Sequence, residues 1–224
     1  MHTSNPLSDG TAGILDITVP MREHMPVFDG DPVFRMTPVT RVIEGDPDTW
    51  NVSNLSFGTH TGTHVDPPRH FDPRGADVEA VSLEVLCGPA RVLDLRGKGL
   101  CIDAGMLANA GLCKEQRLLL RTDGEGWSEG LFSADYGHIT VDAARWLRAH
   151  GVKLLGVGSP SVEAFVSPGM PVHRELLAVQ PSVVVVEGLD LRGVDAGVYE
   201  FLCLPLRIVN GDGGPARAIL RALP

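Results

Sequence analysis

Short apolar runs separated by glycine and proline dominate the hydrophobic pattern of this chain. They are rich in Val, Ile, Leu and Phe and are bounded by turn residues, which is typical of β-strands. The predicted strands are Ile14–Val19, Val33–Val42, Val52–Phe57, Ala90–Leu95, Arg117–Arg121, Val152–Val157, Ser182–Glu187 and Tyr199–Val209.

Two stretches have helical periodicity instead. Asp103–Ala110 begins with a residue suited to an N-cap and is followed by glycine, and Val141–His150 begins after Thr140 and ends at Gly151. A predicted strand follows the second helix at once, as in α/β proteins. Two segments fit single helical turns and a third fits either a last strand or a helix: Ser82–Leu86, Arg174–Leu177 and Gly214–Leu223, respectively.

Strands outnumber helices in this pattern, and neither a repeat nor a linker-like stretch interrupts it. The sequence therefore predicts one mixed α/β domain over residues 1–224. The longest apolar runs are strand-sized, and the segment Met1–Gly10 is polar, so we expect no membrane segment, no targeting segment and a cytoplasmic location.

Composition narrows the class of partner. The formal net charge is −9, which argues against a nucleic-acid-binding protein and against a protein that binds anionic membranes. The four cysteines, Cys87, Cys101, Cys113 and Cys203, form no C-x-x-C pair and lie in apolar contexts. They indicate buried thiols in a reducing compartment rather than a disulfide framework.

Three of the eight histidines fall in one short segment, with the spacing H-x-x-x-H-x-D-x-x-x-H from His60 to His70. Gly62, the β-branched neighbours and the following Pro67–Pro68 disfavour a helix here. In an extended segment, alternate side chains share a face, so His60, His64 and Asp66 would form a facial site for Zn, Mn, Fe or a similar ion, with Gly62 as a spacer.

Two later residues could extend this site. Glu187 ends an apolar run, and a buried carboxylate there needs either a metal ion or an arginine as its partner. His173 precedes a short helical turn, a position at which a histidine without a metal is the somewhat better interpretation.

The segment H60-T-G-T-H64-V-D66-P-P68-R-H70-F71 resembles the motif H-x-G-T-H-x-D-x-P-x-H-F of the metal-dependent cyclase family, which includes bacterial kynurenine formamidases and isatin hydrolases. Other segments resemble further blocks of the family: Leu15–Thr18, Met25–Pro32, Leu119–Asp123, Trp146–Gly151 and Gly156–Glu163. The chain departs from the family pattern at Phe28-Asp29, which replaces Trp-Pro, and at Gly158 and Glu163, which stand at two aspartate positions.

The resemblance implies a swivelling β/β/α-type single domain and a site carried over residue by residue. One ion would be bound by His60, His64 and Asp66, and a second, where present, by Asp66, His173 and Glu187, with Zn²⁺ (one or two ions) or Mn²⁺ as the metal. His70 would be the catalytic acid/base. The family also implies a homodimer or homotetramer with a small-molecule substrate.

The leading functional hypothesis is hydrolysis of N-formyl-L-kynurenine to L-kynurenine and formate, in tryptophan degradation. The alternatives are another activity at the same site (hydrolysis of an isatin-type cyclic amide or of a lactone, or a cyclisation or dehydration) and a metal carrier or sensor without catalysis. Four aromatic residues are candidates for an aryl-binding pocket, although ordinary core packing explains each of them equally well: Phe28, Trp50, Phe57 and Phe71.

Overall fold

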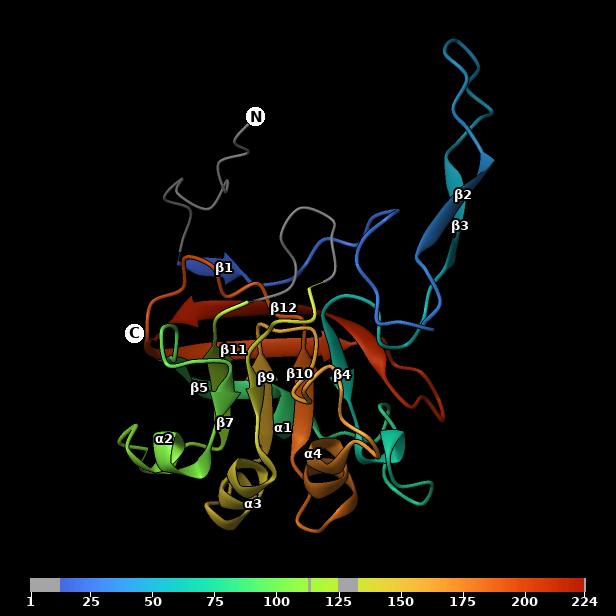
Figure 1. The fold of residues 1–224 in the computed structure, drawn as a ribbon. Helices are drawn as coiled ribbons and strands as arrows, with labels where there is room; N and C mark the ends of the chain where they lie inside the picture. The colour runs from blue at the N-terminus through green and yellow to red at the C-terminus, as the bar shows by residue number, and fades with distance from the viewer. Residues whose placement is uncertain (1–12, 113, 125–132, 224) are drawn as a thin grey trace.

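The computed structural model describes residues 13–112, 114–124 and 133–223. Their main feature is an eight-stranded sheet in the order β1-β12-β11-β5-β7-β9-β10-β4, in which β12 also pairs with β4 (Figure 1). This last pairing closes the sheet into a barrel-like arrangement. The mixed α/β fold expected from the sequence is therefore confirmed.

Four neighbouring strands run parallel at the centre of the sheet: β5 (Cys87–Asp94), β7 (Arg117–Arg121), β9 (Leu154–Val157) and β10 (Val184–Glu187). The strands that complete the sheet are antiparallel to their neighbours: β1 (Ile14–Asp16), β4 (His64–Asp66), β11 (Gly197–Pro205) and β12 (Gly214–Ala222). Residues Gly214–Leu223, which fitted a strand or a helix, thus form a strand.

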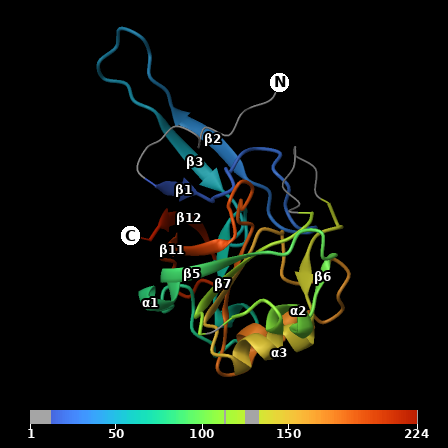
Figure 2. The ribbon, with the colours of Figure 1, turned by 90° about the vertical axis from the view of Figure 1, so that its left-hand side faces the viewer.

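Alternation along the parallel strands creates two cores. On β7, Leu118 and Leu120 face the helices, whereas Leu119 points into the barrel. Because both faces of these strands are buried, the strands appear in the sequence as continuous apolar runs. The helix-side core is completed by α2 (Ala104–Ala108) and α3 (Val141–Ala149), which cover one face of the sheet (Figure 2).

The predicted starts of both helices and the end of α3 are confirmed, whereas α2 ends at Ala108, two residues before the predicted Ala110. The Asp103 side chain accepts a hydrogen bond from the Met106 amide (2.8 Å), and Thr140 accepts one from the Ala143 amide (3.3 Å). Gly151 follows α3 with φ +77°, a conformation that glycine adopts without steric cost.

Short elements occupy the remaining connections. Ser82–Leu86 contains the single turn α1 (Leu83–Leu86), and Arg174–Leu177 lies in a π-helical turn, Arg174–Ala178, that continues α4 (Pro171–His173). A two-stranded pairing that the sequence pattern did not indicate joins β6 (Cys101–Ile102) to β8 (His138–Ile139).

A hairpin of β2 (Arg35–Thr40) and β3 (Val52–Ser56) projects away from the barrel (Figures 1 and 2). Every residue of both strands is exposed. This hairpin carries apolar side chains that the rest of the described chain does not cover.

The prediction that the cysteine thiols are buried is confirmed only in part. Cys203 is buried and Cys87 is half-buried, but Cys101 is exposed, because it lies on the short edge pairing rather than in the core. Cys113 and Met1–Gly10 lie outside the described residues. In the part of the chain that the structure describes, no helix has both the length and the apolar character needed to cross a bilayer.

Candidate metal centre

Strand β4 places two of the expected ligands side by side. It is paired on one side with β10, where His64 lies opposite Glu187, and on the other with β12, where His64 lies opposite Pro215. His64 and Asp66 are two residues apart and share a face, with the His64 Nε2 atom 3.3 Å from Asp66 Oδ1. For these two residues, the predicted alternation is confirmed.

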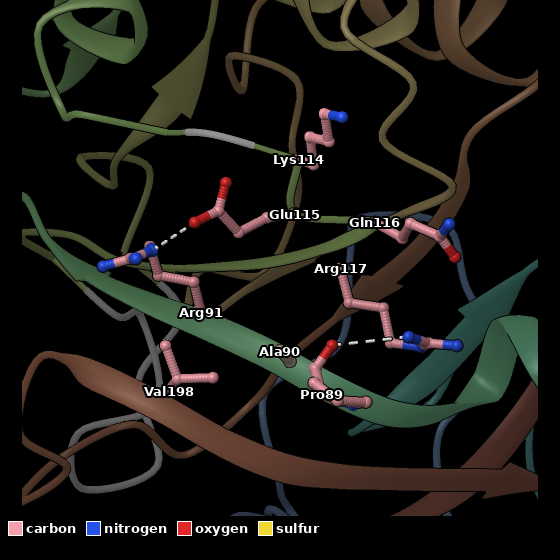
Figure 3. A pocket seen from close by; sticks show the side chains of 8 residues that line it. All are labelled: Pro89, Ala90, Arg91, Lys114, Glu115, Gln116, Arg117 and Val198. Atoms are coloured by element: carbon pink, nitrogen blue, oxygen red, sulfur yellow. Dashed lines mark hydrogen bonds and ion pairs between the residues drawn. The ribbon is translucent and has the colours of Figure 1, made fainter.

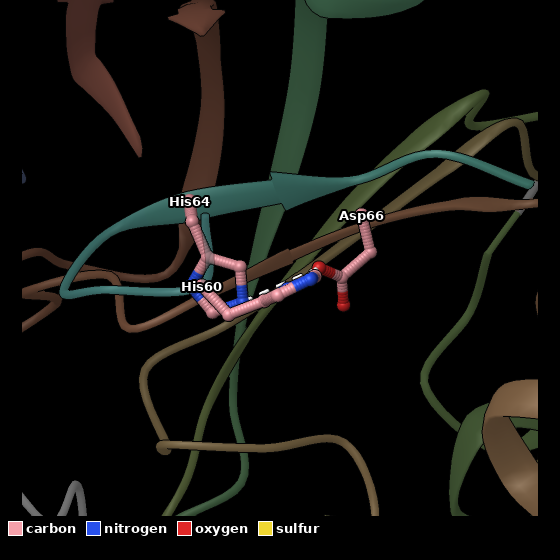
Figure 4. A group of neighbouring side chains, drawn as sticks. All are labelled: His60, His64 and Asp66. Carbon is pink, nitrogen blue, oxygen red and sulfur yellow. Dashed lines mark hydrogen bonds and ion pairs between the residues drawn. The ribbon is translucent and has the colours of Figure 1, made fainter. Parts of the chain in front are cut away.

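His60 reaches the same point by a different route. The strand begins only at His64, and residues 59–63 form a turn in which Gly62 has φ +67°. The turn brings His60 Nδ1 to 2.8 Å from Asp66 Oδ1, while the His64 ring approaches edge-on (Figure 4). The prediction of one extended segment from His60 to Asp66 is therefore wrong, and Gly62 acts as a turn residue rather than as a spacer.

The two later candidates complete the cluster. Glu187 ends β10 and contacts His64 Nε2 through Oε2 (3.5 Å), and His173, from α4, lies 3.2 Å from Glu187 Oε1 through its Nε2 atom. His173 Nε2 is also 3.9 Å from Asp66 Oδ2. The structure thus brings His173 into the site, although the sequence alone slightly favoured a histidine without a metal.

The environment of Glu187 bears on the two partners considered for it, a metal ion and an arginine. Its Oε1 atom accepts hydrogen bonds from the Val162 amide (2.8 Å) and the Ser161 hydroxyl (3.1 Å). Its remaining described contacts are with His64 and His173, so histidines occupy the position where an arginine could have stood.

These residues fit a divalent cation. Two ring nitrogens and one carboxylate oxygen of the cluster are buried without a hydrogen-bond partner in the described residues: His60 Nε2, His64 Nε2 and Asp66 Oδ2. One ligand atom from each of His60, His64 and Asp66 lies within 4.8 Å of the others. Two ligands on one tetrahedral zinc ion stand about 3.4 Å apart, close to the 3.3 Å from His64 to Asp66.

Burial and neighbouring opposite charges shift the pKa values of Asp66 and His173 in opposite directions. Burial favours the neutral forms, but the neighbouring imidazoles outweigh it and hold the pKa of Asp66 well below its usual value. In the same way, Glu163 and Glu187 outweigh burial and raise the pKa of His173 to about 10. A cation must therefore compete with protons for these nitrogens.

His70 lies beside this cluster. It ends the 3₁₀ turn Pro68–His70, and its ring is 4.1 Å from that of His60 and 6.0 Å from that of His173, measured between centroids. Burial lowers the pKa of His70, which favours a neutral imidazole near pH 7. Such a ring can accept a proton and later donate it.

An open cavity gives access to these groups. It is lined by four histidines and Glu187, together with five other residues. The histidines are His60, His64, His70 and His173, and the other residues are Phe28, Asp31, Pro160, Ser161 and Met170. Of these, Asp31, Pro160, Ser161 and Met170 were not predicted as site residues, although all but Met170 lie in segments that resemble the family.

The four aromatic candidates separate in space. Phe28 lines the cavity and packs against Phe165, with ring centroids 5.6 Å apart. Phe71 lies behind the site, stacked on His173 at 5.0 Å, and Phe57 stacks on Phe34 at 6.1 Å. Trp50 is 60% exposed and lies just before β3, in the projecting hairpin. Trp50, Phe57 and Phe71 are therefore not placed in the cavity of this chain.

A second cavity lies at the opposite end of the parallel strands (Figure 3). It lies where Arg117 begins β7, whereas Glu187 ends β10. Arg91 is paired there with Glu115 (2.7 Å), and Arg117 donates hydrogen bonds to the carbonyls of Val85 and Pro89. These charged groups are engaged in internal contacts, so the histidine-lined cavity is the stronger candidate for chemistry.

The comparisons with known proteins agree with this geometry. A family model described as "Putative cyclase" matches residues 15–164. The chain belongs to the cyclase family. It is 38% identical over 210 residues to a kynurenine formamidase of Geobacillus thermodenitrificans, covering 93% of this chain and 97% of the relative. A kynurenine formamidase of Erythrobacter litoralis is 36% identical, with 94% of each chain covered.

Solved structures of this cyclase-family fold superpose well. A potential metal-dependent hydrolase with cyclase activity matches with a TM-score of 0.80 and 29% identity, covering 94% of this chain and 98% of the other. Isatin hydrolase A from Labrenzia aggregata matches with a TM-score of 0.79 and 23% identity, covering 96% of each chain, and supports the fold.

Proposed function

We propose that this protein is a divalent-metal-dependent amidohydrolase that cleaves N-formyl-L-kynurenine to L-kynurenine and formate, a step of tryptophan degradation. The observation that carries the proposal is the cluster of His60, His64, His173 and Glu187 at one open cavity, with the buried Asp66 in contact with the three histidines. The full-length similarity to two kynurenine formamidases supports the choice of substrate.

His60, His64 and Asp66 would hold one ion, and Asp66, His173 and Glu187 would hold a second where one is present. Two imidazoles and a carboxylate suit Zn²⁺ and Mn²⁺. The chemistry that a bound divalent ion supplies in such a site is Lewis acidity, which lowers the pKa of water to about 7.

His70 would transfer a proton from the attacking water to the leaving nitrogen. As a neutral imidazole it takes a proton from the attacking water while the new C–O bond forms at the formyl carbon. It then gives this proton to the aniline nitrogen as the C–N bond breaks, which releases formate and the free amine. Phe28 would lie along the aryl ring, and Asp31 would accept a hydrogen bond from the substrate ammonium group.

The test is an assay of protein loaded separately with Zn²⁺ and Mn²⁺, given N-formyl-L-kynurenine or isatin, with kynurenine followed by absorbance. We expect turnover of the formamide. Turnover of isatin alone would indicate the cyclic-amide alternative. Stoichiometric metal binding with neither reaction would favour a carrier or sensor and refute the proposal.

We further propose that the protein is a homo-oligomer assembled through the β2–β3 hairpin. The hairpin exposes large apolar side chains, among them Met36 (52%), Val39 (64%) and Leu55 (53%). A patch of this kind on a soluble enzyme is typical of an interface. We expect Val39→Glu to reduce the mass measured by light scattering, whereas Val166→Glu, at an exposed site outside the hairpin, should not. A monomeric wild type would contradict this.

The cysteines support a cytoplasmic location. Cys87, Cys101 and Cys203 are free thiols, which suits a reducing compartment. Localisation of the tagged full-length chain by cell fractionation tests this proposal.

A further inference from the structure

Glu163 is a buried carboxylate with an unusual set of partners. Its side chain is only 3% exposed, and its Oε2 atom accepts hydrogen bonds from the backbone amides of Val172 (3.0 Å) and His173 (3.1 Å). The same oxygen lies 3.2 Å from His173 Nδ1, and Oε1 accepts a hydrogen bond from the Ser167 hydroxyl (2.6 Å). The contacts with Val172 and His173 tie Glu163 to α4, and the contact with Ser167 ties it to the segment that leads into α4.

The contact with Nδ1 has a chemical consequence. An ionised carboxylate only accepts hydrogen bonds, so Nδ1 of His173 must carry a proton when it faces Glu163. When the imidazole is neutral, Nε2 then has a free lone pair, and this is the nitrogen that faces Glu187 (3.2 Å) and Asp66 (3.9 Å). Glu163 thereby selects which nitrogen points into the site.

The other two histidines of the cluster differ from His173 in this respect. His64 is oriented by a backbone carbonyl, that of Gly62, at 2.9 Å from its Nδ1 atom. The outer nitrogen of His60, Nε2, faces Asp212 at 3.8 Å, beyond hydrogen-bond distance, and the Asp212 side chain is 56% exposed. His60 Nδ1 faces Asp66 (2.8 Å), itself a proposed ligand, so among these histidines only His173 contacts a buried carboxylate outside the proposed ligand set.

We propose that Glu163 is a positioning residue that fixes the tautomer and ring orientation of His173 and so sets the affinity of the ion held by His173 and Glu187. The inference rests on the proposed metal site. A histidine that donates its outer N–H to a carboxylate is a stronger and better-oriented ligand than a free imidazole. Glu163 stands at a position where the family pattern has aspartate, and its extra methylene lets one carboxylate reach Ser167 and α4 together.

The test compares three variants by zinc affinity, measured with chelator competition and without substrate. Glu163→Gln keeps the acceptor but removes the charge, whereas Glu163→Met removes both at similar volume. Glu175→Gln is the matched control, because Glu175 is a carboxylate two residues from His173 that pairs with Arg145 and Arg148 instead. We expect Glu163→Met to weaken at least one zinc-binding step by about 10- to 100-fold, Glu163→Gln to weaken it less, and Glu175→Gln to leave it within about 3-fold.

A second measurement needs no variant. In zinc-loaded wild-type protein labelled with ¹⁵N at histidine, we expect the His173 resonances to show a protonated Nδ1 and an unprotonated Nε2. The opposite tautomer overturns the inference, as does equal zinc affinity of Glu163→Met and wild type. If Glu163→Met does not fold, the ordering of Glu163→Gln against Glu175→Gln and the wild-type spectrum decide. A wild type that binds no zinc refutes the proposed function and this inference together, whereas normal binding without formamide turnover refutes the function alone.

Discussion

Replacement of His70 by alanine distinguishes the two roles that this residue could have, as a metal ligand or as an acid/base catalyst. One nitrogen of His70 lies within 4.8 Å of ligand atoms of Asp66 and His173, so the ring could bind a metal ion as well as carry a proton. Its ring also packs edge-on against Phe71, with centroids 4.6 Å apart, and it lines the cavity. Geometry therefore allows both roles, and the two predict different losses.

The magnitudes follow from the proposed role. A positioned acid/base contributes about 10²- to 10⁴-fold to a rate, which is about 3 to 5 kcal/mol of activation free energy. Loss of a half-buried ring should cost about 1 to 2 kcal/mol of folding stability, too little to unfold a domain of this size. We therefore expect His70→Ala to stay folded, keep its metal content and lose about 10²- to 10⁴-fold in kcat/KM.

The assay combines metal analysis, thermal unfolding and formamide hydrolysis on the same preparation. His150→Ala is the control, because that exposed histidine lies at the end of α3 and stacks on Trp146 (centroids 3.7 Å apart). Loss of bound metal in His70→Ala would mean that His70 is a ligand. Activity within about 3-fold of wild type would refute an acid/base role altogether.

Two further predictions concern the ligands. A methyl group at Gly213 would lie 2.6 Å from His60 Cε1, so Gly213→Ala should displace His60 and weaken metal binding by about 10-fold. The control is Gly105→Ala, where the nearest atom is 3.2 Å away and metal affinity should not change. Equal metal affinities of the two variants would contradict this prediction. In metal-free protein, the pKa of His173 is raised from 6.5 to about 10 and that of Glu187 is lowered from 4.5 to about 2. The contribution of His173 to stability is complete below pH 6.5 and is lost as the pH rises through 10, whereas that of Glu187 is complete above pH 4.5 and is lost as the pH falls through 2. Calorimetry in chelator should therefore find the highest unfolding temperature between these limits, about pH 4.5 to 6.5, and a maximum above pH 8 would refute it.

Local patterns predicted the parts of the fold that local forces determine. The parallel strands, the two main helices and their caps follow from apolar runs, N-cap side chains and Gly151. Closure of the sheet did not follow, because pairing of β12 with β4 joins segments far apart in the sequence. The β6–β8 pairing is only two residues long, which is too short for a periodic signal.

The candidate site was predictable to a similar extent. His60, His64 and Asp66 were found from their spacing, although the turn at Gly62 was not. His173 was assigned to the site only through the family resemblance, because nothing around it in the sequence indicates that α4 faces β10. The aromatic residues were the least predictable, since side-chain type does not reveal which face of a segment borders a cavity.

The pairing of β12 with β4 also determines when the candidate metal site can form during synthesis of the chain. The strand that carries His64 and Asp66 lies between β10 and β12, and β12 is the last strand of the described chain. During translation, His64 and Asp66 leave the ribosome early, but their strand β4 lacks its second neighbouring strand until β12 has emerged and paired with it. Such non-local pairing is slow. A metal ion held at this site would therefore be retained only after β12 has been made, and chains truncated before β12 should fail to retain it.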